Sequence, residues 1–230
     1  MLEIIATTVE DAVYIEEGGG DRIELVSALS EGGVTPSYGL IRQVLLAVNI
    51  PVNVMIRPHT NSFVYSATDL QCMLDDIEQC KILGANGVVL GMLDSDGNIA
   101  LGQLEKALER CRGLEVTFHR ALDKSKDPLT SVRALAGTGV RRVLSSGGPG
   151  LAEDNLEVLK EMQKILAEAG KTLLVGRGIT LENCGPILQA TAAPELHVGN
   201  AARRDHSPVA PVELGRVEKI AAAYQRAVSR

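Results

Sequence analysis

The chain is poor in aromatic side chains and in clustered positive charge. Its 230 residues include four Tyr, two Phe and no Trp, so few rings are present to stack on bases or to anchor at a membrane surface. Lys and Arg number 23 against 29 Asp and Glu, and no basic run is longer than a pair such as Arg203 and Arg204. Nucleic-acid binding requires clustered Lys and Arg. Nucleic acid is therefore not an expected partner.

Long apolar runs and closely spaced cysteines are also missing. No apolar stretch approaches the roughly 20 residues that span a bilayer, and the first residues lack the basic and apolar regions of a secretory signal. We therefore expect no membrane partner and a cytoplasmic location. The cysteines are Cys72, Cys80, Cys111 and Cys184. Because they are widely spaced in a chain of this size, we expect reduced thiols and no disulfide framework.

Short β-branched runs alternate with stretches of helical periodicity along the whole sequence, a pattern typical of repeated βα units. Strands are predicted at 2–6, 22–26, 52–56, 87–90, 115–118, 141–144, 172–175 and 195–198. The clearest helices are predicted at 69–83, 102–111, 154–169 and 211–228.

Eight such units favour a closed (β/α)8 barrel over an open, doubly wound sheet. The open sheet usually carries a G-x-G-x-x-G turn after its first strand, whereas the first turn here runs Thr7-Thr8-Val9-Glu10. No linker rich in Pro, Gly or Ser interrupts the repeat. We therefore predict one α/β domain over 1–230, with the segment 206–230 closing the barrel through the last helix.

Polar and glycine residues gather at the predicted strand ends, where barrels of this kind build their ligand sites. The candidate ligand-binding residues are Glu3, Arg57, Arg120, Ser145, Gly147, Arg177, Gly178, His197 and Gly199. Guanidinium groups match carboxylate and phosphate oxygens, and glycine turns after the last strands can present backbone N–H groups to phosphate. The pattern predicts a site for a small anionic ligand, although such turns also carry glycine for steric reasons alone.

Two-residue alternation predicts which side chains face the barrel interior. The interior set is Glu3, Ile5 and Thr7 on the first strand, Glu24 and Val26 on the second, and Asn53, Met55 and Arg57 on the third. Glu3 and Glu24 would then lie near Arg57 and near Arg120 or Arg177. Glu24 and His119 are the catalytic candidates, with Glu24 paired to His119 or His197 as acid and base. The alternative is an ion-pair network that stabilises the mouth and binds nothing.

Local metal-binding motifs are missing from the sequence. There is no C-x-x-C, H-x-H or H-E-x-x-H, and the four histidines lie far apart. A metal site would have to be assembled across strands. Its candidate ligands are Met55, His119 and His197, with Glu24 beside them.

Five segments together resemble the CutC family of copper homeostasis proteins, and the resemblance runs from Leu2 to about Asp205. The segments are GGGDRIEL at 18–25, EGGVTPSYGL at 31–40, VMIRP at 54–58, VTFHRA at 116–121 and RVLSSG at 142–147. The resemblance implies a cytoplasmic (β/α)8 barrel, often dimeric or otherwise oligomeric, that is linked to copper tolerance and copper(I) binding. It implies no established reaction.

The sequence departs from the family at positions that bear on copper. Many members carry cysteines that face the barrel interior where this chain has Ile5, Val26 and Val198, and thiolates are the ligands that select copper(I). Two functions are therefore expected. One is copper homeostasis with binding or buffering of copper(I). The other is an enzyme or binding protein for a small anionic metabolite, because the polar residues at the predicted strand ends are retained.

Overall fold

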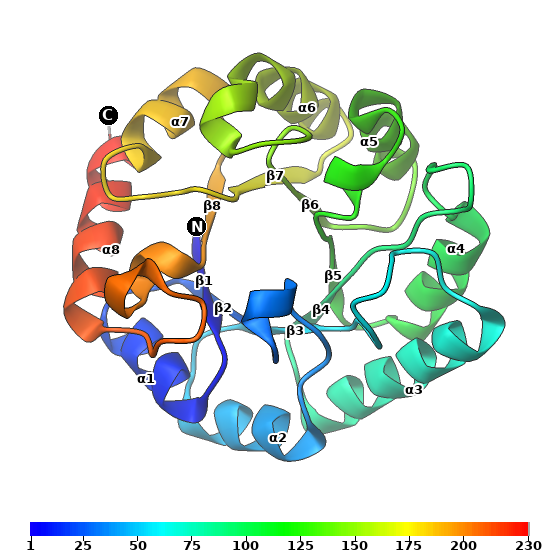
Figure 1. The fold of residues 1–230 in the computed structure, drawn as a ribbon, viewed down its shortest axis with the longest axis horizontal. Coiled ribbons are helices and arrows are strands. Elements are labelled where there is room, and N and C mark those ends of the chain that lie inside the picture. The colour runs from blue at the N-terminus through cyan, green and yellow to red at the C-terminus, as the bar shows by residue number, and fades with distance from the viewer. Residues whose placement is uncertain (230) are drawn as a thin grey trace.

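The computed structural model describes residues 1–229 and contains, within them, a closed barrel of eight parallel strands inside a ring of eight helices (Figure 1). The predicted (β/α)8 barrel is confirmed. The strands pair in chain order, and the last closes on the first. They are β1 (Leu2–Ala6), β2 (Arg22–Leu25), β3 (Val52–Met55), β4 (Gly87–Leu90), β5 (Glu115–Phe118), β6 (Arg142–Ser145), β7 (Thr172–Gly176) and β8 (Glu195–Val198).

The helices begin where the sequence supplies capping groups. The Ser66 side chain accepts from the backbone N–H of Asp69, whose carboxylate accepts from the backbone of Ser66. Asp127 accepts from two backbone N–H groups of the first turn that follows it. The helices are α1 (Val9–Glu17), α2 (Tyr38–Ala47), α3 (Ala67–Leu83), α4 (Leu101–Arg110), α5 (Pro128–Ala136), α6 (Leu156–Glu168), α7 (Cys184–Thr191) and α8 (Leu214–Val228).

The last helix starts later than its predicted position of 211. The backbone N–H of Val212 instead donates to the buried carboxylate of Asp11 at 2.9 Å, and that of Glu213 donates to the carbonyl of Ala202 at 3.0 Å. From Leu214 onward α8 lies between α7 and α1 and completes the ring (Figure 1). Arg230, the last residue of the predicted closing segment 206–230, lies outside the described residues.

Alternation along each strand separates two apolar cores. Outward residues such as Ile4 and Ile23 pack beneath the helices in the larger core. Four inward residues form a second core inside the barrel: Ile5, Val26, Met55 and Val89. The predicted inward positions of Ile5 and Val26 are confirmed, because these side chains pack against one another within the barrel.

Val198 was predicted to face the barrel interior, and this is wrong. It belongs to the outer core together with Leu196, whereas His197 between them contacts groups inside the barrel. Neighbouring residues of a strand point to opposite faces. Val198 must therefore face the helices.

An ion-pair network closes the end of the barrel where the strands begin. Arg22 bonds to the carboxylates of Glu3 and Glu195, and Arg142 bonds to Glu115 at 2.6 Å and lies 3.3 Å from Glu195. The main cation beside Glu3 is thus Arg22, not one of the arginines at the other end that were predicted for it. Buried charges paired in this way fix the geometry of this end of the barrel, which we call the barrel floor.

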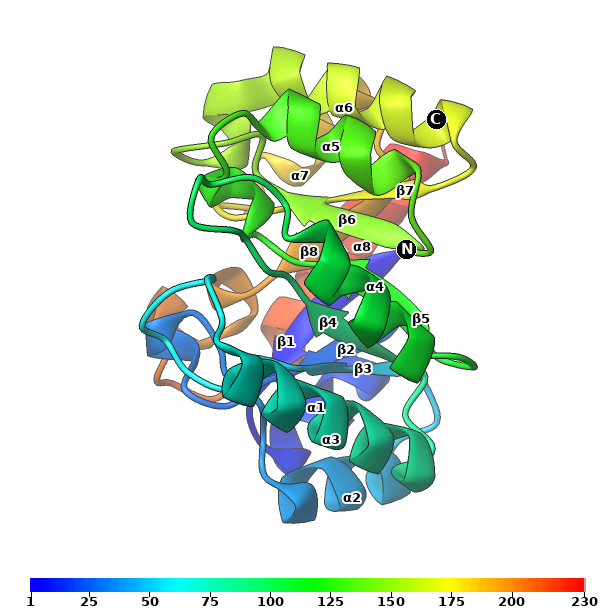
Figure 2. The ribbon, with the colours of Figure 1, turned by 90° about the vertical axis from the view of Figure 1, so that its right-hand side faces the viewer.

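The opposite end, where the strands finish, carries the longer connections (Figure 2). They include the short turn η1 (Leu29–Glu31), which lies across the mouth in Figure 1, and the turn η4 (Asn200–Ala202) after β8. Within residues 1–229 no helix has the length and apolar character needed to cross a bilayer.

Candidate functional site

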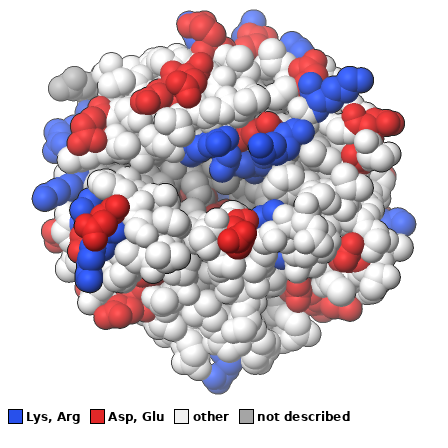
Figure 3. Space-filling view, in the orientation of Figure 1, with Lys and Arg blue, Asp and Glu red and all other residues white. Residues whose placement is uncertain are grey.

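A cavity of about 1280 Å³ opens at the ends of the strands. Its apolar wall includes inward side chains of the barrel: Ile5, Val26, Met55 and Leu144. Its basic lining residues include Arg120, Lys124 and Arg177. Figure 3 shows Lys and Arg side chains gathered along one side of the hollow at the centre of this face. Positive charge is thus concentrated at the mouth of a chain whose net charge is -6.

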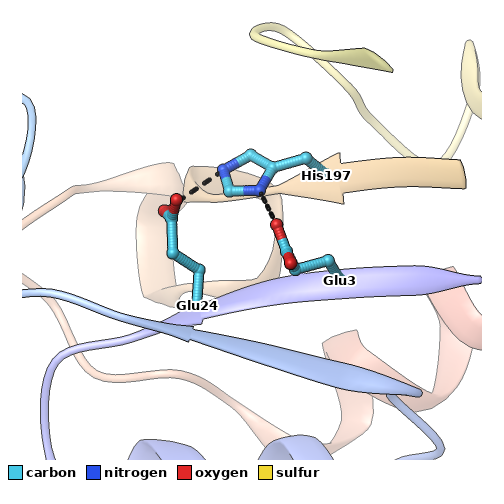
Figure 4. A group of neighbouring side chains, drawn as sticks. All are labelled: Glu3, Glu24 and His197. Carbon is cyan, nitrogen blue, oxygen red and sulfur yellow. Dashed lines mark hydrogen bonds and ion pairs between the residues drawn. The ribbon is translucent and has the colours of Figure 1, made fainter. Parts of the chain in front are cut away.

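Below the mouth, His197 lies between two carboxylates (Figure 4). Its Nδ1 is 2.8 Å from Oε1 of Glu3, and its Nε2 is 3.6 Å from Oε2 of Glu24. Strand register produces this arrangement, because Glu3 of β1 is paired with His197 of β8 on one side and with Arg22 of β2 on the other. All three side chains are buried. We call Glu3, Glu24 and His197 the barrel triad.

The two carboxyl groups of the triad have opposite pKa shifts. Burial acts to raise the pKa of Glu3, but the Arg22 guanidinium and the hydrogen bond to His197 outweigh it and lower that pKa to about 2. Burial raises the pKa of Glu24 to about 7, and the charge of Glu3 adds to the effect while His197 and Arg120 oppose it. Glu24 therefore gains and loses its proton near neutral pH.

His197 carries the positive charge of the triad. Burial alone would lower its pKa, yet the charges of Glu24 and Glu3 and the hydrogen bond to Glu3 raise the pKa above 6.5. The Glu3 contact also fixes the orientation of the ring, which leaves Nε2 directed at Glu24. Oε1 of Glu24 is buried and accepts no hydrogen bond from any residue of the described chain. Glu24 is also one of the residues that line the cavity.

His119 contributes a second polar group to the cavity, three strands further around the barrel from Glu24. Its Nδ1 accepts a hydrogen bond from the backbone N–H of Ala121 at 3.1 Å. Burial, followed by the charge of Arg57, lowers the pKa of His119 to about 3. The ring is therefore neutral, and because Nδ1 acts as an acceptor the ring proton resides on Nε2. Because its pKa is low, its Nδ1 already accepts a hydrogen bond and its Nε2 carries the proton, this ring is a poor general base at neutral pH.

Arg57, predicted as an anion ligand, lines the cavity but is also bonded to backbone carbonyls. Its Nη1 donates to the carbonyl oxygens of Glu31 at 3.2 Å and Gly33 at 3.0 Å. Its guanidinium carbon lies 4.7 Å above the centre of the Phe63 ring. Gly32 and Gly33 both have φ of +87°, the left-handed region that favours glycine. Arg57 thus holds the η1 turn across the mouth.

Arg120 is positioned by a carboxylate that the sequence analysis missed. Asp123, in the turn η2 (Leu122–Lys124), accepts from Nε of Arg120 at 2.9 Å and from the hydroxyls of Ser145 and Ser146 at 2.6 and 2.8 Å. Ser145 also accepts from the backbone N–H of Gly147 at 2.9 Å. The predicted ligand residues Ser145 and Gly147 therefore support Arg120 from behind. An acidic residue three positions after Arg120 was the available signal.

The glycine turns after β7 and β8 border the cavity as predicted for Arg177, Gly178 and Gly199. Arg177 and Gly178 both have positive φ, 76° and 78°, so the chain turns sharply there. The carbonyl of Gly178 accepts from the Asn183 side chain at 2.8 Å. A Cβ on Gly199 would lie 3.1 Å from the end of the Ile5 side chain, a tight contact that Ile5 would have to relieve by shifting. The two turns thus have structural reasons for glycine.

The barrel triad has the spacing of a metal site but not its chemistry. Glu3, Glu24 and His197 each offer an atom within 4.8 Å of the others. Both oxygens of Glu3 are already engaged, by Arg22 and His197, and the raised pKa of His197 favours the protonated ring, which binds no metal. These residues are better suited to carrying a proton.

A thiolate copper site is not present in the cavity either. Within residues 1–229, none of the four cysteines lines it, and Met55 is the one sulfur side chain that does. Of the other two predicted metal ligands, His119 presents a protonated Nε2 and His197 faces Glu24 through its own Nε2. The residues present do not fit a thiolate copper(I) centre.

The fold and the site define a (β/α)8 barrel with a cavity at its mouth that is lined by ionisable side chains. The chain belongs to the CutC family, whose model matches residues 1–202. A human protein named copper homeostasis protein cutC homolog is 41% identical over 205 residues, which are 89% of this chain and 75% of that protein. A family protein CutC of Glaesserella parasuis serovar 5 is 37% identical over 203 residues, 88% of this chain and 83% of that protein.

Solved structures agree with this assignment. A crystal structure titled as the putative copper homeostasis protein CutC of Streptococcus agalactiae superposes with a TM-score of 0.80 and 32% identity, covering 86% of this chain and 97% of that one. A phosphoribosylanthranilate isomerase of Pyrococcus furiosus superposes with a TM-score of 0.64 over 98% of both chains. At 14% identity, the second similarity shows the shared fold alone.

Proposed function

We propose that this protein acts in copper homeostasis, the role stated in the names of its relatives, through a small anionic organic ligand bound in the mouth cavity. The observation that supports the proposal is the buried Glu24 carboxyl group, which borders a cavity lined by arginines and has a pKa of about 7. A carboxyl group is costly to bury without a partner. Perturbed ionisable groups in a cleft are typical of functional sites.

Each site residue has a part in this proposal. Arg120, held by Asp123, and Arg177 supply positive charge for a carboxylate or phosphate group of the ligand. Glu24 accepts or donates a proton at the ligand, and His197 holds Glu24 through Nε2. Glu3 orients His197. The apolar wall that includes Met55 and Val26 excludes water from the region where the proton moves.

Ligand-dependent stabilisation tests the proposed function. We expect the melting temperature to rise with the concentration of at least one member of a panel of inorganic phosphate, phosphate esters and short organic acids. A ligand at 100 times its Kd would stabilise the fold by about 2.7 kcal/mol. Arg177→Gln should weaken the effect at least tenfold in concentration, since it removes a cation from the rim. Arg133→Gln, on the outer helix α5 and exposed, is the matched control. No stabilisation by any probe would overturn the proposal.

Direct binding of copper(I) is the second candidate, and it comes from the names of the relatives together with Met55. The Met55 thioether is a soft donor on the cavity wall. Its expected affinity is low, because a single thioether without thiolates is a weak ligand set for copper(I).

Introducing cysteines at two inward positions of the barrel tests this candidate. We expect the wild-type protein not to withdraw copper(I) from a chromogenic chelator under anaerobic conditions. The double variant Ile5→Cys, Val26→Cys should do so, because the two side chains pack together in the inner core. A double variant with cysteines at two exposed positions, Leu46→Cys and Ile82→Cys, is the control. Wild-type competition that is lost in Met55→Leu would show instead that copper(I) binds directly.

A further inference from the structure

His119 is a cavity-lining residue held in a rigid position, and it carries a hydrogen-bond donor that has no partner in the described chain. Its ring packs against the backbone just after β4 so closely that a Cβ on Gly91 would lie 2.4 Å from Nδ1. On another side the Phe63 ring centre is 5.1 Å away. Nδ1 accepts from the Ala121 backbone, so the proton of the neutral ring is on Nε2. That nitrogen is buried and has no hydrogen-bond partner within residues 1–229.

Glu24 is the complementary group in the same cavity. Its Oε1 is also buried and lacks a partner in the described chain, while its other oxygen faces His197. His119 and Glu24, which follow β5 and lie in β2, both line the cavity. The first carries a neutral N–H donor and the second a carboxyl oxygen, and neither atom has a hydrogen-bond partner in the described chain. A bound ligand that satisfies both must offer an acceptor oxygen to His119 and a removable proton to Glu24.

We propose that the ligand is a small anionic carbonyl compound, a keto acid or a phosphorylated ketone, and that Glu24 and His119 together move a proton on the carbon beside its carbonyl group. This inference rests on the proposed function and specifies its substrate class. The carbonyl oxygen accepts a hydrogen bond from Nε2 of His119, and the anionic group faces Arg120 and Arg177 at the rim.

The proposed step balances without a further reactant. Glu24 in its carboxylate form removes the proton, so the C–H bond breaks and an O–H bond forms on Glu24. The electron pair forms a carbon–carbon double bond as the carbonyl oxygen becomes an enolate oxygen. His119 remains neutral and stabilises that oxygen by hydrogen bonding. Return of the proton to the same carbon regenerates the substrate. With a hydroxyketone the intermediate is an enediolate, and delivery of the proton to its neighbouring carbon isomerises the substrate when the remaining hydroxyl proton passes to the other oxygen of the enediolate.

A neutral imidazole suits this role better than a protonated one. A donor that keeps its proton at neutral pH stabilises the enolate oxygen throughout the reaction without first having to be charged. The arrangement around His119 maintains the neutral ring through burial and the Ala121 N–H group. Glu24, whose other carboxyl oxygen faces His197, is the group that exchanges the proton.

Hydrogen–deuterium exchange at carbon tests the inference. Pyruvate, 2-oxoglutarate and dihydroxyacetone phosphate are incubated in D₂O with the full chain, and proton NMR follows loss of the signal beside the carbonyl. We expect catalysed exchange with at least one probe. Glu24→Gln should slow it by about 100-fold or more, because it removes the base. Glu109→Gln, an exposed residue of α4, makes the same charge change away from the cavity and should leave the rate unchanged.

Variants of His119 test the role of its N–H donor separately from that of the Glu24 base. His119→Phe fills a similar volume without an N–H group and should lower the exchange rate by about 100-fold. His119→Gln offers an amide N–H and should recover part of that loss. Nitrogen NMR of the wild-type ring provides a measurement that no folding defect affects. We expect an unprotonated Nδ1 and a protonated Nε2 from about pH 5 to about pH 8.

The outcomes separate this inference from the proposed function. A probe that raises the melting temperature but exchanges no faster with wild type than with Glu24→Gln would overturn the inference and leave the anion site standing. Undiminished exchange in a folded His119→Phe, or a ring protonated on Nδ1, would also overturn it. If no anion binds the wild-type chain, the proposed function fails and the inference fails with it.

Discussion

At the scale of single residues, two glutamates beside one histidine are given different protonation behaviour by their surroundings. Glu3 shares its carboxylate with Arg22 and stays ionised, whereas burial dominates at Glu24, which titrates near pH 7. Two carboxyl groups with well-separated pKa values can take separate parts, one orienting the histidine and one exchanging the proton. The sequence predicted an acid–base pair of Glu24 with His119 or His197, and in the structure His197 is the histidine beside Glu24.

The raised pKa of Glu24 predicts a pH-dependent effect of removing it. The folded chain holds this proton up to about pH 7, whereas the usual value is 4.5, so the stabilising effect is complete below pH 4.5 and disappears as the pH rises through 7. Glu24→Gln cannot lose the proton. Relative to wild type, its free energy of unfolding should increase by about 3 kcal/mol from pH 4 to pH 8.

Urea denaturation of both proteins at pH 4, 6 and 8 measures this difference. Glu109→Gln is the control, since its exposed carboxyl on α4 changes the same charge outside the barrel. Parallel stability profiles for wild type and Glu24→Gln would show that Glu24 does not titrate near pH 7.

At the scale of elements, the turn η1 lies over the mouth of the barrel and is held there by Arg57, which follows β3. Leu29 packs on the inner apolar core, and Arg57 donates to carbonyls on either side of Gly32. The position of Arg57 after a predicted strand and before Pro58 predicted that it lies at the mouth. That position could not identify the carbonyl acceptors, because these depend on a loop conformation set by glycines with positive φ.

Loosening this turn should be measurable by amide hydrogen exchange. We expect Arg57→Met to accelerate exchange of residues 28–34 at least tenfold, because the variant removes the bonds to Glu31 and Gly33. Exchange in β5 and β6 should be unchanged. Arg133→Met on α5 is the control. Equal protection of 28–34 in wild type and Arg57→Met would contradict the role assigned to Arg57.

Strand alternation also explains which element-level predictions succeeded. The pattern correctly placed Ile5 and Val26 inside the barrel. At β8 the family resemblance placed Val198 inside the barrel, and this is wrong because His197 faces inward and adjacent residues of a strand cannot share a face. Asp123 was missed for a different reason. It lies beyond a strand end in a short turn, and only the folded chain brings it against Ser145 and Ser146 of β6 and the residue after it.

At the scale of the whole molecule, the barrel has a closed charged floor and an open mouth. The eightfold alternation of strands and helices was sufficient to predict the fold, because each βα unit repeats the same apolar pattern. The floor was not predicted. Arg22 and Arg142 lie at strand beginnings, and their partner Glu195 is 173 positions from Arg22, so pairing across the barrel leaves no local signal.

Glu3 connects the two ends, because one of its oxygens bonds to Arg22 and the other to His197. Glu3→Gln should lower the free energy of unfolding by about 3 kcal/mol, since it removes one partner of a buried ion pair. Because the pKa of Glu3 is lowered from 4.5 to about 2, this loss should be full above pH 4.5 and should shrink as the pH falls toward 2.

Glu195→Gln is the matched control, because it also removes a carboxylate from Arg22 but does not contact His197. Both variants should destabilise the fold in urea. Only Glu3→Gln should lower the pKa of His197 in an NMR titration, since Glu3 acts to raise it. A His197 pKa that is equal in the two variants would show that the floor and the mouth are electrostatically independent. The expected difference would instead establish that the ion pairs of the floor help to set the protonation state of the candidate site.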